Sequence, residues 1–232
     1  FTPASQQLDG VLGMISLGVL FVMTGQIEYA VRGAGDGPLT PSGVDIRPQS
    51  YNGSAPLTPL IIGTEVIFVA AKSHAVRSLY VDPIQGRYES NELSIMADHM
   101  LIGHEIVAWD FAQAPHSIVQ MVRSDGQLLG VTYIREHEIW GWHRHTTKGL
   151  FESLVTIPEG AIDVSYEIVN RTVGGATKRF VEVFAPRENV TRVDGVFVDC
   201  SLTYDGRVSG GATITITGGT LWVPEEMVQL TA

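Results

Sequence analysis

Four hairpin signals recur along the chain at a nearly constant spacing, and this pattern constrains the fold more than any other feature. Each signal is a pair of apolar, β-branched segments around a short turn. The turns fall at Thr24-Gly25, Lys72-Ser73, Asp125-Gly126 and Gly174-Gly175, so they are about 48 to 52 residues apart. Asp-Gly between apolar segments is the strongest of these signals, because it suits the turn that joins two twisted strands.

A unit of this length has room for roughly four strands of five to six residues with their turns. Four-stranded units repeated at about 40 to 50 residues are typical of propeller blades, which must stack on neighbours to bury their faces. The sequence therefore predicts an all-β fold, a propeller-like array of about four antiparallel blade-type hairpin units. We expect this array to be part of a larger β-propeller protein, because four blades are about the minimum for closure.

Composition agrees with an all-β fold. The chain has 25 Gly and 11 Pro, and segments rich in Ala, Glu, Lys and Leu are almost absent. Residues 91–104 are the exception, since Leu93, Met96 and Met100 have helical spacing, and we predict a short helix or turn there. Residues 33–60 are rich in Gly, Pro and Ser, which predicts an extended loop at the surface or at a subunit contact.

The residue pattern of the sequence changes after Pro186. Residues 189–232 include a segment in which Thr and Ile alternate, as in a half-buried strand. We predict a propeller-like β domain over residues 1–188, and the start of a second small β element or closing strands over 189–232. The single cysteine, Cys200, excludes an intramolecular disulfide and is expected to lie buried in a strand. Because the chain begins at Phe1 without Met, we expect it to be part of a longer or processed protein.

The charge balance argues against a nucleic-acid-binding protein. The formal net charge is −10, and the sequence contains no run of Lys and Arg that would build a basic patch for phosphates. The apolar segment from Val11 to Met23 is interrupted by Gly13 and Gly18 and has no basic residues before it. It is shorter than the roughly 20 residues of a membrane helix. We predict two buried strands there, no membrane contact and no sequence-specific binding of nucleic acid.

Histidines are concentrated between His137 and His145, in the segment HEIWGWHRH. A zinc protease motif needs two His four residues apart on a helix, whereas His137 and His143 are six apart. On a strand, one face would carry His137, Ile139, Gly141, His143 and His145, and the other Glu138, Trp140, Trp142 and Arg144. His143 and His145 have the spacing of a chelating pair. A polar strand face or a subunit contact is the stronger interpretation, and we assign no metal ligand.

No other motif indicates catalysis. Asp98, His99, His104 and Glu105 form a second polar cluster in which an acid–base pair is conceivable, but no nucleophile with an oxyanion-hole loop accompanies it. The sequence contains no G-x-S-x-G, Walker or Rossmann signature, and the glycine-rich segment 33–37 reads as a plain turn. We predict a non-enzymatic protein with no catalytic residues, no cofactor-binding residues and no cofactor.

The tryptophans leave one alternative open. Trp109, Trp140 and Trp142 are expected to pack between neighbouring sheets, as aromatic side chains at blade edges do. Propellers that bind sugars also display tryptophan. The alternative interpretation is therefore a propeller-type binding module that recognises a carbohydrate or a host receptor.

Several segments together resemble one known family. Residues 122–158 combine a D-G-x-L hairpin, a T-Y strand, a W-H-x-H strand, a turn with Gly and a strand toward a Pro. This combination resembles the phage tail nozzle proteins, the tail tubular protein B-like family that includes DNA-stabilisation and head-to-tail connector proteins. The matching residues are Asp125, Gly126, Leu128, Thr132, Tyr133, Trp142, His143, His145, Gly149 and Ser153.

Other parts of the chain are similar to the same family. The similarity covers roughly residues 15–205 and is most specific over 122–182. It includes a Q-S-x-x-G element, an R-x-L-Y strand and an R-T-x-x-G hairpin with an Arg and a Glu on its second strand. The residues are Gln49, Ser50, Gly53, Arg77, Leu79, Tyr80, Pro115, Arg171, Gly174, Arg179 and Glu182. The chain departs from the family pattern at Ile139 and Gly141 and in a less glycine-rich turn at Ala71-Lys72.

The resemblance implies a structural role in the virion of a bacteriophage or prophage. Members form rings, often sixfold, in the tail tube or its distal nozzle, where they retain packaged DNA and let it pass on ejection. The implied partners are further copies of the chain and other tail or connector proteins. The implied location is the virion tail, after synthesis in the cytoplasm of the bacterial host. The family has no catalytic residues to transfer to this sequence, and its members extend beyond this length.

Overall fold

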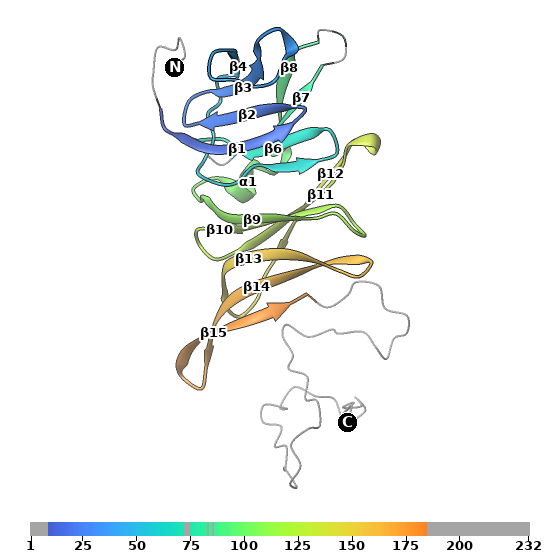
Figure 1. Cartoon of the computed structure of the whole chain (residues 1–232). Coiled ribbons are helices and arrows are strands. Elements are labelled where there is room, and N and C mark those ends of the chain that lie inside the picture. Colours follow the sequence, from blue (N-terminus) through green and yellow to red (C-terminus); the bar gives the residue numbers. More distant parts are fainter. Residues whose placement is uncertain (1–8, 72–74, 83, 85, 185–232) are drawn as a thin grey trace. The chain divides into compact units, whose positions relative to one another are not determined.

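A computed structural model describes residues 9–71, 75–82, 84 and 86–184 of the chain (Figure 1). All of these residues belong to the first of two units into which the chain divides, Phe1–Glu188 and Asn189–Ala232. The predicted boundary near 186–190, the β elements predicted for 189–232 and Cys200 lie outside the described residues.

The described residues form four antiparallel sheets, numbered first to fourth along the chain, and in each sheet the strands pair in sequence order. The first sheet contains β1 (Val11–Leu17), β2 (Val19–Thr24), β3 (Glu28–Gly33) and β4 (Val44–Ser50). The second contains β5 (Leu60–Ile62), β6 (Glu65–Val69), β7 (Val76–Val81) and β8 (Tyr88–Glu92). Each sheet is therefore a meander made from one continuous segment.

The third and fourth sheets repeat this plan. The third sheet contains β9 (Ile106–Ala112), β10 (Ile118–Arg123), β11 (Leu128–Ile134) and β12 (Ile139–His145), and the fourth contains β13 (Leu150–Glu159), β14 (Ile162–Val173) and β15 (Ala176–Val183). Among the described residues, helical structure is limited to short turns, which are η1 (Ala34–Asp36), η2 (Ile95–Ala97), α1 (Asp98–Leu101) and η3 (Arg135–His137). The all-β prediction is confirmed, as is the short helix predicted within residues 91–104.

The predicted hairpins occupy the same position in every sheet, because each joins the second strand to the third. The turns at Thr24-Gly25, Asp125-Gly126 and Gly174-Gly175 are present, and the last two contain glycines with positive φ. The β6–β7 pairing is also present, although Lys72-Ser73 lies outside the described residues. The spacing of the turns is thus the spacing of the sheets. Between residues 9 and 184 these sheets do not close into a ring (Figure 1), so the propeller itself remains a prediction.

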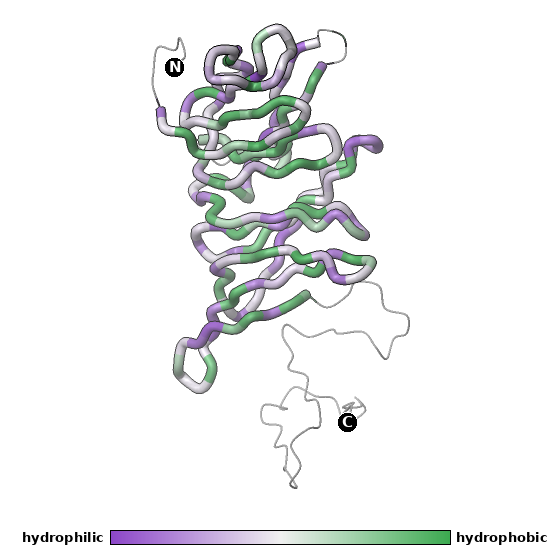
Figure 2. Tube along the Cα trace, viewed as in Figure 1, coloured by the Kyte–Doolittle hydropathy of each residue, from purple (hydrophilic) through white to green (hydrophobic). Residues whose placement is uncertain are grey.

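The core lies between successive sheets. Phe21 and Met23 of the first sheet pack against the second sheet. Val119 and Met121 of the third sheet pack against the other face of the second sheet. Val122 and Leu128, also of the third sheet, pack against the fourth. Hydrophobic residues accordingly run along the strands, and hydrophilic residues gather at the turns (Figure 2).

In β6, consecutive residues are apolar because both faces of this strand are buried. Successive side chains of a strand point to opposite faces. Val66 and Phe68 therefore contact the first sheet, while Ile67 and Val69 contact the third. Each of these side chains is buried and stabilises the fold by about 1.5–3 kcal/mol.

Two predictions need correction at the edge of the first sheet. Residues 33–60 are not one loop, because β4 lies within them and pairs with β3. Pro48 is compatible with this strand, because an edge strand has an unpaired side on which the missing N–H costs nothing. Val11 to Met23 does form two strands, β1 and β2, but β1 is only partly buried and its Met14 side chain is exposed. No helix among the residues described here is long and apolar enough to cross a membrane.

The tryptophans divide into two groups. Trp109 and Trp142 pack between the second and third sheets, as predicted. Their indole N–H groups donate hydrogen bonds to the carbonyl oxygens of Thr58 (2.8 Å) and Leu93 (3.0 Å). Trp140 is instead 42% exposed. The described tryptophans therefore do not line a concave sugar-binding face.

Candidate assembly surface

The fourth sheet differs from the other three in having three strands among the described residues. β15 occupies the third position of its sheet. The strands in that position elsewhere, β3, β7 and β11, are largely buried and have a fourth strand beside them, whereas seven of the eight residues of β15 are exposed. β15 pairs with β14 along one edge, and no described strand pairs with its other edge.

Local sequence explains why β15 forms although it is so exposed. Gly174 and Gly175 have φ values of +60° and +78°, the left-handed conformations that a two-residue hairpin turn requires. Continuous pairing from Val173–Ala176 to Tyr166–Val183 then sets the register of the strand. β15 is thus a long, regular strand, and among the described residues only one of its edges is paired.

The two faces of the fourth sheet follow from this register. Val169 and Phe151 face the third sheet, where they pack with Val122 and Leu128. The opposite face is exposed and apolar, and we call it the outer apolar patch. It consists of Val155, Ile157, Ile168, Val181 and Val183.

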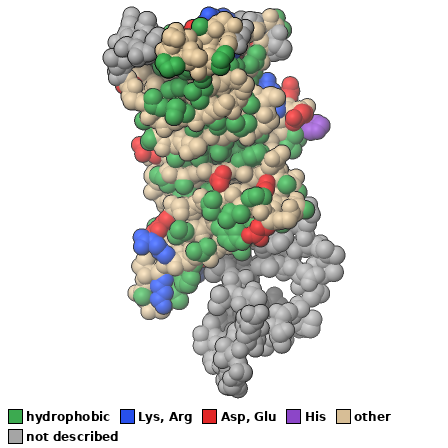
Figure 3. Space-filling model, in the orientation of Figure 1, with side chains coloured by type: hydrophobic (Ala, Val, Ile, Leu, Met, Phe, Trp, Pro, Cys, Tyr) green, Lys and Arg blue, Asp and Glu red, His purple; other side chains and the backbone are tan. Residues whose placement is uncertain are grey.

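The outer apolar patch is continuous across all three strands. Ile168 lies directly opposite Val181, and Tyr166 lies between Val155 and Val183 in the register. Val181 is 73% exposed. Figure 3 shows hydrophobic side chains at the surface over successive sheets of the molecule. An apolar face beside an open strand edge is a surface on which another β segment can pair and bury side chains.

Ion pairs stiffen the same sheet. Arg171 of β14 is buried, its Nη2 lies 2.7 Å from Oε2 of Glu182, and its Nη1 donates to the Thr147 hydroxyl. Arg179 binds Glu152 at 2.6 Å on the exposed side of the sheet, and this bond lowers the pKa of Glu152. The Arg and Glu residues on which the family resemblance rests therefore hold β13, β14 and β15 to one another.

Polar side chains also lie between the third and fourth sheets. Glu167 is 2% exposed, it lies opposite Glu182 in the register, and its Oε1 atom has no hydrogen-bond partner. Burial and the nearby Glu182 carboxylate raise the pKa of Glu167 to about 8. Sequence reasoning missed this residue. The available signal was an acidic residue inside the strand segment SYEIV, at a position that alternation places on the inner face.

The histidine segment is only partly as predicted. His143 and His145 lie on the same face of β12, with ring centroids 5.0 Å apart. The His143 ring occupies the space over Gly130, where any Cβ atom would overlap it. His137 does not share this face, because it belongs to η3, and Glu138 has a positive φ that separates η3 from β12. In the part of the chain that the structure describes, no three His, Cys, Asp or Glu side chains form a group that could hold a metal ion.

The second predicted polar cluster is spread over separate contacts. Asp98 begins α1, whereas His104 lies 3.7 Å from Asp125 in the β10–β11 turn. Hydrogen bonding from Arg123 lowers the pKa of Asp125 to about 2. The backbone N–H of Glu105 donates to the Ser124 hydroxyl. These contacts fasten the β10–β11 turn and form no acid–base pair with a nucleophile. Residues 33–37 form a turn around η1, as predicted.

Comparison with known proteins adds no relative. No family model matches the chain, and a search of curated proteins found no match.

Proposed function

We propose that this chain is a structural component of a bacteriophage or prophage tail or head-to-tail connector. It would form part of the tube or nozzle that retains DNA and passes it on ejection. In this proposal it acts by assembly and not by catalysis, in a ring of identical subunits together with other tail proteins. The observation that carries the proposal is the fourth sheet, whose outer apolar patch and β15 edge, unpaired among the described residues, offer a surface for a neighbouring β element.

Two further points support the proposal. The resemblance to tail nozzle proteins is most specific over residues 122–182, which include the third-sheet hairpin and the strands of the candidate surface. The net charge of −10 suits a wall along which DNA moves without adhering, because phosphate groups are repelled by an acidic surface. The meander sheets also have the strand order of propeller blades, so the array extends in this proposal into a larger propeller.

Electron microscopy of the full-length protein, alone and with virions, tests this function directly. We expect ring-shaped particles of the protein and density for it at the tail. A protein that stays monomeric at all concentrations and is absent from purified virions would refute the proposal.

Substitution of Val181 tests the role of the patch. Val181→Lys places a charge in the centre of the outer apolar patch, so we expect it to weaken assembly by about tenfold or more, since burying an unpaired charge is costly. Analytical ultracentrifugation over a concentration series measures the effect. The control is Val107→Lys, which makes the same change at another exposed valine (46%) on β9, outside the patch. Equal assembly of both variants and the parent would show that the patch is not the contact.

A further inference from the structure

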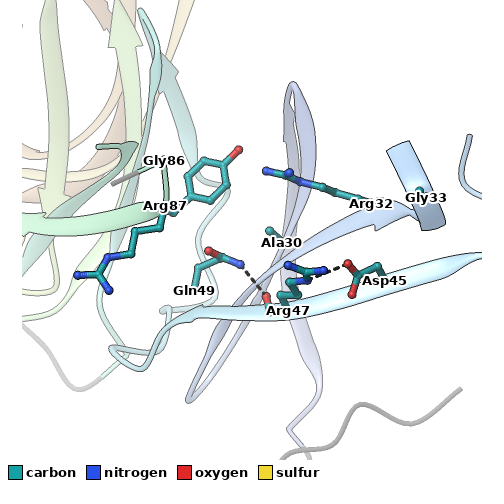
Figure 4. A pocket seen from close by; sticks show the side chains of 10 residues that line it. Ala30, Arg32, Gly33, Asp45, Arg47, Gln49, Gly86 and Arg87 are labelled. Carbon is teal, nitrogen blue, oxygen red and sulfur yellow. Dashed lines mark hydrogen bonds and ion pairs between the residues drawn. The ribbon is translucent and has the colours of Figure 1, made fainter. Parts of the chain in front are cut away.

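A polar pocket of about 390 Å³ lies where the first and second sheets meet at their outer strands (Figure 4). β3 and β4 provide Arg32, Arg47 and Gln49 on one side, and the start of β8 provides Arg87 and Tyr88 on the other. The pocket lies apart from the outer apolar patch, which belongs to the fourth sheet.

The packing of the two sheets explains why the pocket exists. Phe21, Phe68 and Leu79 are buried between the two sheets and fill the space there. On the face of β3 that packs against the second sheet, Ala30 has a small side chain, and it lines the pocket. Tyr88 forms a fixed wall, because its ring packs edge-on against Phe21 with the ring centroids 4.8 Å apart.

Positive charge is concentrated at this pocket in a chain that is acidic as a whole. Three guanidinium groups and one carboxylate, that of Asp45, line it, although the chain has 15 basic and 25 acidic residues. Arg47 pairs with Asp45 at 2.8 Å, and Arg87 lies 3.8 Å from Glu89. Arg32 forms no ion pair with any carboxylate in the described residues, and its guanidinium carbon lies 5.9 Å from the centre of the Tyr88 ring.

Arg32 is therefore ready to bind an anion without first losing a partner. Contact with the aromatic ring restricts a guanidinium group and leaves its N–H donors available. Figure 4 shows Arg32 on β3, with Arg47 and Gln49 on the neighbouring strand. The Arg47–Asp45 pair is solvent-exposed, so it contributes little stability and Arg47 can turn toward a ligand at low cost.

We propose that this pocket binds a small oxyanion, a carboxylate or phosphoryl group carried by a sugar-sized molecule, with Arg32 as the anchoring residue. The planar fork of a guanidinium group matches two oxygen atoms of such an anion. The Gln49 amide and the Tyr88 ring supply a hydrogen-bonding group and a flat apolar surface for the remainder of the ligand. The volume lies in the range of small-molecule sites, which is about 300–1,000 Å³.

Isothermal titration calorimetry on the full chain tests the site with three probes at constant ionic strength. The probes are sodium glucuronate, inorganic phosphate and uncharged glucose. We expect saturable binding at one site per chain for glucuronate, phosphate or both, and none for glucose. Binding of glucuronate alone identifies a carboxylate ligand, and binding of phosphate alone identifies a phosphoryl ligand.

Two variants locate the binding. Arg32→Gln should weaken binding by about tenfold or more, because a charge-assisted hydrogen bond is lost. Arg144→Gln removes an exposed arginine from β12 in the third sheet and should leave binding unchanged. Binding of neither anion, or equal binding by Arg32→Gln and the parent, would overturn the proposal. Because Arg32 is exposed, the variant is expected to fold, which far-UV circular dichroism checks.

Discussion

Three glutamates are buried among the described residues, and their partners differ. Glu28 accepts a hydrogen bond from the Ser50 hydroxyl, and Glu65 accepts one from Tyr133 and pairs with Arg135. The Oε1 atoms of Glu28 and Glu167 both lack a hydrogen-bond partner, and Glu167 in addition lies opposite another carboxylate, Glu182, in the register. The contact between the third and fourth sheets therefore contains a carboxyl group whose protonated form is favoured by its surroundings.

Glu167→Gln should change how stability depends on pH. The pKa of Glu167 is raised from 4.5 to about 8, so the folded protein retains a proton that the unfolded chain releases between these values. The free energy of unfolding of the parent should therefore fall as pH rises through this window, by up to about 1.4 kcal/mol per pH unit. The glutamine side chain does not titrate, so the free energy of unfolding of the variant should lack this fall with pH. The variant should therefore be more stable than the parent above pH 8. Urea denaturation at a series of pH values measures the difference.

Glu105→Gln is the matched control, because it makes the same chemical change at an exposed glutamate. Its pH profile should run parallel to that of the parent. If the Glu167→Gln profile also runs parallel to the parent, the residue does not carry the proton assigned to it.

At the scale of the element, hairpin turns set the order of the strands. Gly126 has a φ of +81°, and a Cβ atom built on it would lie 2.7 Å from Cβ of Leu150, the first residue of β13. Gly160 has a φ of +66° but open space around it. The two glycines share a backbone conformation and differ in their surroundings.

Alanine at each of these glycines should separate conformation from packing. Gly160→Ala should cost about 1–2 kcal/mol, the cost of a side chain in the left-handed region. Gly126→Ala should cost about 1–3 kcal/mol more, because Leu150 must move. Chemical denaturation of both variants gives the comparison. Equal losses would mean that the β10–β11 turn does not contact β13 as described.

The same turns account for how much of the fold could be predicted. Asp125-Gly126 and Gly174-Gly175 are local signals, so the hairpins and their spacing were readable from the sequence. β4 was not, because it is held by pairing with β3, and its Gly- and Pro-rich surroundings indicate a loop. His137 was misplaced because a single left-handed residue, Glu138, ends the alternation. The exposure of β15 depends on neighbouring sheets, which no local pattern reports, whereas the alternation in SYEIV was a local signal for the inner position of Glu167.

At the scale of the whole unit, the second and third sheets have a neighbour on both faces, and the first and fourth have one among the described residues. Amide hydrogen exchange should follow this order. We expect β6, β10 and β11 to exchange slowest, and β1 and β15 to exchange about tenfold faster or more, since local opening is easiest where fewest side chains are buried. Mass spectrometry of peptic fragments measures these rates. Protection of β15 equal to that of β11 would contradict the open edge.

The construction of each sheet from one continuous segment also has a consequence for how such a chain can change over generations. Duplication of a segment of about 50 residues adds a complete meander with two faces of the same kind as those beside it. No existing strand has to change its partner, because the strand order within each sheet is the order of the sequence. Such an architecture can gain or lose whole sheets by single genetic events, while point mutations adjust only the faces that meet.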